Sequence, residues 1–130
     1  MSKLMLGLFM ISTFMLAGVK TANATPELVQ SGITIIDIRT EPEWVQTGII
    51  KDSIPITFFD ARGNYDAEKF LDTISKYVNK GEEFALICRT GNRTTAVSDF
   101  LGKQGYDVIN LKGGVVSLEK QGFKLVPYTK

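Results

Sequence analysis

The sequence contains no histidine and only one cysteine, Cys88. The absence of histidine excludes Ser-His-Asp and Cys-His catalysis as well as every histidine-ligated metal site. A lone cysteine forms no internal disulfide and no multi-cysteine metal site, so it is either an inert buried residue or a reactive thiol. We therefore expect neither a metal centre nor a bound cofactor.

Neither sign of charge is in excess, since 15 Lys and Arg residues face 14 Asp and Glu residues along the 130-residue chain. The basic residues alternate with acidic ones and form no stripe, which argues against nucleic-acid binding. A chain of this length is enough for one small domain.

Residues 1–24 have the pattern of a secretory signal peptide. Lys3 supplies the positive start, residues 4–19 form a nearly unbroken apolar run, and Ala22-Asn23-Ala24 fits a small-x-small cleavage site. The run is shorter than the ~20 residues that comfortably span a bilayer. We expect cleavage after Ala24, export to the bacterial periplasm and no stable membrane insertion of the remaining chain; an uncleaved anchor is the alternative. Removal of residues 1–24 changes the formal charge from +1 to −1.

Beyond residue 24, strand patterns alternate with helix patterns. Runs of apolar and β-branched residues predict strands at 33–38, 53–56, 84–87 and 107–111. Capping residues and glycines bound predicted helices at 26–31, 41–46, 66–80, 94–103 and 115–121. In the helix that begins after Asp66, the residues expected on the buried stripe are Phe70, Ile74 and Tyr77. The alternation predicts a single α/β domain over residues 25–130, with a mainly parallel sheet of about five strands flanked by helices.

The most informative segment is residues 85–94, where an apolar strand runs into Cys88, then a short loop, then a helix start. Loop N–H groups, the helix N-terminus and the guanidinium groups of Arg89 and Arg93 all stabilise a thiolate. Gly91 lets successive N–H groups point inward as a nest for an anion. An ionised thiol needs no general base, which fits a chain without histidine. Cys88 and Arg39 both follow strands, so we expect them to meet at the carboxyl edge of the sheet, where ligands bind.

The spacing within the loop limits what it holds. Four residues separate Cys88 from Arg93, whereas cysteine phosphatases and arsenate reductases place five residues between the two and encircle a tetrahedral oxyanion. A shorter loop makes a smaller ring, better suited to one extra sulfur atom on the cysteine. A phosphatase or arsenate reductase is therefore the least favoured function.

The loop Cys88-Arg-Thr-Gly-Asn-Arg93-Thr94 resembles the active-site loop of rhodanese-type sulfurtransferases. Asp37-Ile38-Arg39 followed by Glu43-Trp44 and Gly48-Ile49 is similar to an early motif of that family, and Leu111-x-Gly113-Gly114 to its later glycine pair. The histidine that the family carries after Gly48 is absent here. The resemblance covers nearly the whole of residues 25–130, and export of one small domain is similar to periplasmic phage-shock-type rhodaneses.

The resemblance implies a rhodanese-like fold and a thiosulfate:cyanide type of sulfur transfer. Cys88 would take the outer sulfur of an anionic donor such as thiosulfate, form a persulfide, and pass the sulfur to a thiol, cyanide or protein acceptor. It also implies site roles for neighbouring residues: donor and persulfide binding for Arg89, Thr90, Gly91, Asn92 and Arg93, and loop support for Asp37, Arg39 and Thr94. A non-catalytic sulfur carrier or interaction module in the periplasm is the alternative function.

Overall fold

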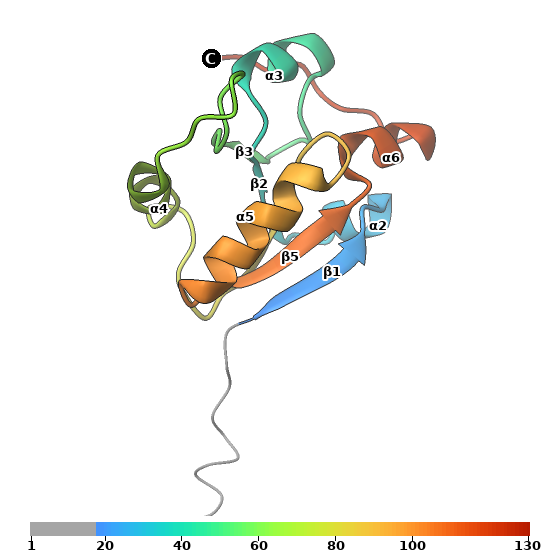
Figure 1. The fold of residues 1–130 in the computed structure, drawn as a ribbon. Helices are drawn as coiled ribbons and strands as arrows, with labels where there is room; N and C mark the ends of the chain where they lie inside the picture. Colours follow the sequence, from blue (N-terminus) through green and yellow to red (C-terminus); the bar gives the residue numbers. More distant parts are fainter. Residues whose placement is uncertain (1–17) are drawn as a thin grey trace, which may run out of the picture.

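The structure is a computed structural model and describes residues 18–130 (Figure 1). Within these residues, five strands form one sheet in the order β1-β5-β4-β2-β3, and every neighbouring pair is parallel. The strands are β1 (Val19–Asn23), β2 (Thr34–Asp37), β3 (Ile54–Pro55), β4 (Glu83–Ile87) and β5 (Asp107–Lys112). The expected α/β fold with a parallel sheet is confirmed, and the short Pro55 strand lies at an edge, where a missing N–H is tolerated.

Helices cover both faces of this sheet, as the strand-to-strand crossovers of a parallel sheet require. The helices are α2 (Pro26–Val29), α3 (Glu41–Thr47), α4 (Ala67–Ile74), α5 (Asn92–Lys103) and α6 (Gly114–Lys120). α4 and α5 pack on one face and α2 and α6 on the other, while α3 lies beyond the carboxyl ends of the strands (Figure 1).

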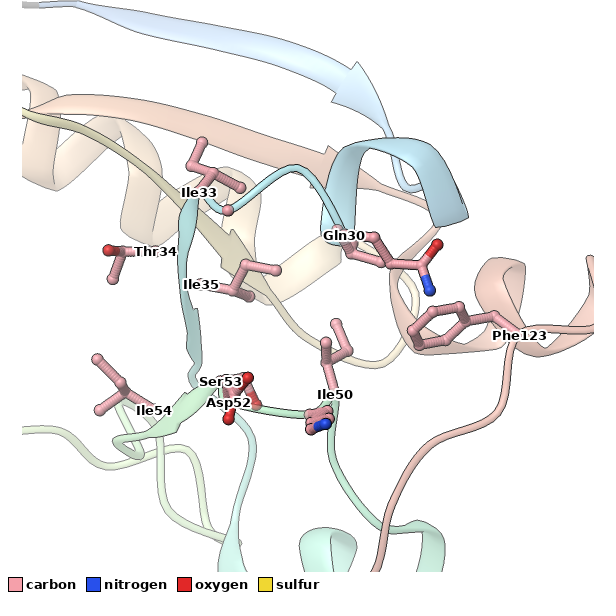
Figure 2. Close-up of a pocket in the computed structure, with 12 residues that line it drawn as sticks. Gln30, Ile33, Thr34, Ile35, Ile50, Asp52, Ser53, Ile54 and Phe123 are labelled. Carbon is pink, nitrogen blue, oxygen red and sulfur yellow. The ribbon is translucent and has the colours of Figure 1, made fainter.

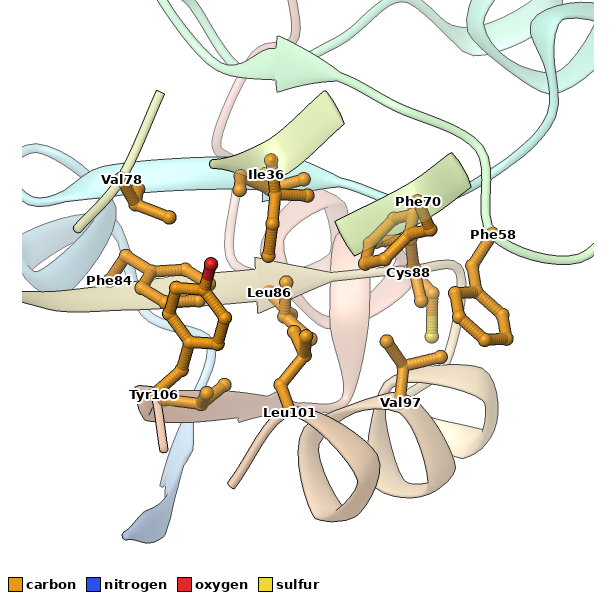
Figure 3. Packing of buried hydrophobic residues seen from close by; sticks show 13 residues of the cluster. Ile36, Phe58, Phe70, Val78, Phe84, Leu86, Cys88, Val97, Leu101 and Tyr106 are labelled. Carbon is orange, nitrogen blue, oxygen red and sulfur yellow. The ribbon is translucent and has the colours of Figure 1, made fainter. Parts of the chain in front are cut away.

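Alternate residues of each strand feed two separate hydrophobic cores, because side chains of a strand point to opposite faces. Ile36 and Leu86 belong to the core under α4 and α5, where Phe70 and Leu101 meet them (Figure 3). Their strand neighbours Ile35 and Ala85 belong to the second core, together with residues of α2 and α6. Both faces are buried, which explains why β2 and β4 read as continuous apolar runs rather than alternating ones.

β1 was not predicted from the sequence, because its residues were assigned to the leader. It pairs with β5 over five positions, from Val19 opposite Val108 to Asn23 opposite Lys112. Ala24, the residue before the predicted cut, is fully buried, and its N–H donates to the Lys112 carbonyl at 2.9 Å. Cleavage after Ala24 would therefore remove an edge strand of the sheet. The rest of the predicted leader, residues 1–17, lies outside the described residues, and within residues 18–130 no helix has the length and hydrophobicity to cross a membrane.

The prediction for α4 was wrong at its C-terminal end. Phe70 and Ile74 are buried as expected, but α4 ends at Ile74 and Tyr77 is 53% exposed. A turn follows the helix, so the i+3 spacing that placed Tyr77 on the buried stripe no longer applies. Val78 takes the buried position in that turn, and its N–H donates to the Ile74 carbonyl at 3.0 Å.

Candidate active site

The carboxyl ends of β2 and β4 bring the predicted site residues together. Asp37 is the last residue of β2 and pairs with Ile87, the last residue of β4. Cys88 directly follows β4, and Arg39 is the second residue after β2. The sequence-based expectation that they meet at one edge of the sheet is confirmed, since adjacent parallel strands end side by side.

The loop after β4 folds back on the cysteine. Gly91 has φ 104°, a conformation that side-chain-bearing residues rarely adopt. This turn directs the Gly91 N–H to the Cys88 Sγ at 3.2 Å, and α5 begins at the next residue, Asn92. The sulfur thus accepts a backbone N–H at the positive end of a 12-residue helix, a setting that stabilises negative charge.

A polar network on β5 and α5 supports the other side of the loop. Thr94, which is fully buried, lies with its hydroxyl oxygen 3.6 Å from Cys88 Sγ and 2.6 Å from the Asn110 side-chain oxygen. The Asn110 amide nitrogen in turn donates to the Thr95 hydroxyl at 3.1 Å, and that hydroxyl donates to the Gly91 carbonyl at 2.8 Å. A Thr hydroxyl has one proton; the Thr94 hydroxyl donates it to the Asn110 side-chain oxygen, and the Thr94 oxygen accepts from the Cys88 thiol.

Asn110 was not predicted from the sequence as a site residue. The available signal was a polar side chain inside the otherwise apolar strand β5, where a buried amide requires a partner. Its partners are more than ten positions away in sequence, on α5, so the signal shows that a partner exists without showing which one.

The start of α6, at the glycine pair Gly113-Gly114, is hydrogen-bonded to the backbone of the cysteine loop. The Val115 N–H donates to the Cys88 carbonyl at 3.0 Å, and the Val116 N–H donates to the Arg89 carbonyl at 3.1 Å. Gly114 has φ 60°, and a Cβ there would overlap these same two carbonyl groups. The lack of a side chain at Gly114 thus allows α6 to approach the cysteine loop.

Asp37 and Arg39 form a buried ion pair that fixes α3 rather than touching the loop. Arg39 Nη2 lies 2.8 Å from Asp37 Oδ2 and also donates to the Gly48 carbonyl at 2.9 Å. Arg39 Nη1 donates to the Thr47 hydroxyl at 2.8 Å. Both charged side chains are at most 1% exposed, and such buried charges are tolerated when paired and hydrogen-bonded. The contacts of Arg39 beyond Asp37 thus go to the C-terminal end of α3.

α3 reaches the loop through a second ion pair. Arg93 Nη1 and Nη2 donate to the two carboxylate oxygens of Glu43, each at 2.7 Å. The same carboxylate accepts the Thr40 N–H at 3.2 Å at the start of α3, as a capping Glu does. The hydrogen bond from Arg93 is the largest cause that lowers the pKa of Glu43 to about 2. The sequence indicates Glu43 only as part of a family-like motif, because the residue with which it pairs is 50 positions away.

The remaining loop residues face solvent. Arg89, Thr90 and Asn92 are exposed, whereas Gly91 is buried and Arg93 is half-buried. Within residues 18–130, the structure gives Arg89 no salt bridge. The loop therefore presents the guanidinium of Arg89 to solvent, whereas the guanidinium of Arg93 is already paired with Glu43.

Cys88 itself is almost completely covered, with 1% exposure. On the side away from the Gly91 N–H it belongs to the core under α4 and α5, and Figure 3 shows its sulfur directed between the Phe58 ring and Val97. Phe58 is 8% exposed. Its ring stacks with the ring of Tyr65 at 5.1 Å between centroids, and Tyr65, which is 61% exposed, lies on the solvent side. A reagent must displace this aromatic cover or the loop to reach the sulfur.

We expect Phe58→Ala to increase the rate at which iodoacetamide alkylates Cys88 by about tenfold, which corresponds to ~1.4 kcal/mol less opening free energy. Phe84→Ala is the matched control, because Phe84 lies in the same core but at the opposite end of β4. Equal acceleration in both variants would show that alkylation follows general destabilisation and not local cover.

The two larger cavities differ in where they lie relative to the cysteine. One of about 450 Å³ borders the aromatic cover of Cys88, because Phe58 and Tyr65 are among its lining residues. The other, of about 440 Å³, is found at the amino ends of β2 and β3 (Figure 2), where its lining includes Ile33, Ile50 and Phe123. None of the predicted site residues lines it, and it lies at the edge of a parallel sheet opposite to the one where ligands bind. A smaller hollow of about 170 Å³ adjoins the site, and Arg39, Glu43 and Arg89 are among its lining residues.

Comparison with known proteins agrees with this geometry. The model of the family described as "Rhodanese-like domain" matches residues 21–121. This chain belongs to the rhodanese-like domain family. The match begins within β1, so part of that strand is included in the family's domain. The fold of this rhodanese-like protein thus agrees with the resemblance noted in its sequence.

Several relatives carry related names. The chain is 33% identical over 85 residues to YtwF of Bacillus subtilis, which has a provisional sulfurtransferase name; the match covers 65% of this chain and 72% of that protein. It is 26% identical over 95 residues to a protein of Allochromatium vinosum named sulfurtransferase, covering 72% of this chain and 78% of the other. These names support sulfur transfer as the general activity of this rhodanese-like protein.

Solved structures share the fold. A rhodanese-related protein from Thermoplasma volcanium superposes with a TM-score of 0.61 at 23% identity, covering 80% of this chain and 96% of the other. A rhodanese-like domain from Anabaena superposes with a TM-score of 0.62 at 16% identity, covering 82% and 79%.

Proposed function

We propose that this protein is a sulfurtransferase that carries sulfur as a persulfide on Cys88, with an anionic donor of the thiosulfate type. The observation that supports this most directly is the Gly91 N–H directed at Cys88 Sγ at the start of α5. That contact favours an anionic sulfur without any histidine base. The sulfurtransferase names of relatives agree with the same chemistry.

The reaction has two displacement steps. In the first, the Cys88 thiolate attacks the outer sulfur of thiosulfate; a sulfur–sulfur bond forms on Cys88, the bond to the sulfonate sulfur breaks, and sulfite leaves with the electron pair. In the second, cyanide, a thiol or a protein acceptor attacks the outer sulfur of the persulfide, and the Cys88 thiolate is regenerated. No cofactor takes part, since both steps exchange one sulfur between nucleophiles.

The loop residues have distinct proposed roles. Arg89 attracts the donor, and Thr90, Gly91, Asn92 and Arg93 surround the donor and the persulfide. Thr94 supports the loop next to the sulfur, and Asp37 and Arg39 support it through α3. All of these groups follow the carboxyl end of a strand or belong to the start of α5, so one sheet edge carries the entire site.

The burial of Cys88 favours one alternative function. A thiol that is 1% exposed restricts access of large acceptors, and a carrier that is loaded once and unloaded by a specific partner would have the same feature. Such a carrier would accept a sulfur atom but show no multiple turnover with cyanide.

Export to the periplasm is part of the proposal and is supported by the sequence of residues 1–24 alone. β1 limits how the leader is processed. A cut after Ala24 removes that strand, whereas a cut upstream of Gly18 keeps it.

The deciding experiment is intact-mass spectrometry of the protein before and after treatment with thiosulfate. We expect a mass increase of one sulfur atom, reversed by cyanide with release of thiocyanate. Turnover with excess cyanide indicates an enzyme, and a stable adduct without turnover indicates the carrier. Absence of any adduct would contradict both functions.

A further inference from the structure

We propose that Glu43 is a specificity-determining residue of this site: by holding Arg93 in an ion pair, it shifts donor preference away from doubly charged thiosulfate and toward singly charged thiosulfonates. This inference rests on the proposed function, because it concerns the donor of the same reaction. It assigns a substrate-related role to a residue on α3 that touches neither the sulfur nor the cysteine loop backbone.

The ion pair between Glu43 and Arg93 has a well-defined bidentate geometry. Both terminal nitrogens of Arg93 donate to Glu43, one to each carboxylate oxygen, at 2.7 Å. Such a bidentate arrangement is the strongest form of an Arg–carboxylate contact. The carboxylate is held in turn by the Thr40 N–H and hydroxyl, at 3.2 and 3.0 Å. Glu43 is therefore anchored on its own helix, and Arg93 is the side chain that is drawn to it.

The pair lies beside the cysteine loop: Arg93 is in the first turn of α5, which begins directly after Gly91, and Glu43 lines the same hollow of about 170 Å³ as Arg89. The charges of Glu43, Cys88 and Asp37 all contribute to raising the pKa of Arg93, after the hydrogen bond to Glu43, which is the largest cause. Partial exposure of the pair, 27% for Arg93 and 25% for Glu43, leaves it in contact with solvent at the site. An electrostatic effect on an incoming anion is thus expected, although reduced by the surrounding water.

The net charge of the site determines which donor anions it stabilises most. Arg89 is exposed, and within residues 18–130 it has no salt bridge, so it attracts any anion. Arg93 together with Glu43 carries no net charge. An additional free cation at Arg93 would stabilise a dianion about twice as much as a monoanion, because Coulomb energy is proportional to the charge of the donor. Neutralising Arg93 therefore penalises thiosulfate more than a thiosulfonate.

Both donors load Cys88 by the same balanced step. Thiosulfate transfers its outer sulfur to the thiolate and leaves as sulfite. Methanethiosulfonate, a monoanion, transfers its terminal sulfur and leaves as methanesulfinate. With cyanide as the acceptor, each cycle gives thiocyanate, so one assay measures both donors and differs only in donor charge and leaving group.

The experiment measures the ratio of kcat/KM for thiosulfate to kcat/KM for methanethiosulfonate in four proteins: wild type, Glu43→Gln, Arg93→Gln and the double variant. Gln at position 43 keeps the acceptor that caps α3 while removing the charge. We expect Glu43→Gln to raise the ratio about five- to tenfold and Arg93→Gln to lower it by a similar factor. The double variant is expected to return to the wild-type ratio within about twofold, since its pair is again neutral.

Other outcomes separate the alternatives. If the double variant keeps the low ratio of Arg93→Gln, donor preference depends on the Arg93 side chain itself and not on the net charge of the Glu43–Arg93 pair, and the inference is wrong. Glu41→Gln is the matched control, because Glu41 lies on the same helix but contacts Lys130 at 3.4 Å and the Tyr128 hydroxyl at 3.3 Å. An equal rise of the ratio in Glu41→Gln would show a general effect of net charge and would also overturn the inference.

The proposed function and this inference fail in different ways. If wild type forms no persulfide and no thiocyanate with either donor, the sulfurtransferase function is wrong. If both donors turn over but the ratio is unchanged across the four proteins, only the role of Glu43 is wrong. Should Glu43→Gln not fold, Glu43→Asp replaces it, because the shorter carboxylate loosens the bidentate pair and is expected to raise the ratio, whereas an unchanged ratio would overturn the inference.

Discussion

Replacing Cys88 with serine is expected to reduce thiocyanate formation by about three orders of magnitude or more and to abolish the sulfur adduct in the mass spectrum. A serine hydroxyl forms no persulfide. Near neutral pH it is ionised only with the help of an adjacent base, and this chain has no histidine to act as one. Serine is nearly isosteric and still accepts the Gly91 N–H, so the fold is expected to be retained.

Ser98→Ala is the matched control for this variant. Ser98 is 1% exposed on α5, the helix that begins at the cysteine loop, and its hydroxyl has no hydrogen-bond partner in the part of the chain that the structure describes. Removal of this hydroxyl is expected to change the free energy of unfolding by no more than about 1 kcal/mol and to leave turnover unchanged. Residual turnover in Cys88→Ser at more than a few per cent of wild type would rule out a persulfide on this residue.

Removing residues 1–24 is expected to lower the free energy of unfolding by about 2–4 kcal/mol relative to the chain that begins at Gly18. The deletion breaks the pairing of β1 with β5 over five positions, and each net backbone hydrogen bond contributes about 1 kcal/mol. It also removes the buried Ala24, whose carbonyl accepts a hydrogen bond from Gln121 at 2.8 Å. The loss is partly offset because fewer residues need to be ordered. Urea unfolding of both chains measures the difference.

This measurement also bears on export. If the two chains are equally stable, β1 is dispensable and the cleavage site after Ala24 is compatible with a fully stable domain. If the shorter chain is destabilised, the mass of the exported protein becomes decisive: a mature chain that starts at Thr25 lacks β1, and one that starts upstream of Val19 retains it.

Much of the architecture followed from local patterns. Strands and helices beyond residue 24 were located from apolar runs, caps and glycines, because a parallel sheet buries both faces and gives continuous apolar runs. α4 was predicted too long, since the sequence periodicity continues to Tyr77 although the helix ends at Ile74. β1 was missed because Val19–Asn23 is mostly polar and exposed and overlaps the predicted cleavage region, so that only its pairing with β5 reveals a strand.

The chemical identity of the site was contained in one contiguous segment, residues 88–94, since strand, loop and helix start are local features and Cys88 has no competitor in the sequence. What the tertiary structure alone decided is the electrostatic state and accessibility of that segment. Arg93 is neutralised by Glu43, Thr94 is held by Asn110, and Phe58 covers the sulfur, and each partner comes from a distant part of the chain. Sequence spacing determines local backbone geometry, but contacts between distant segments depend on how the strands are ordered in the sheet, which no local pattern records.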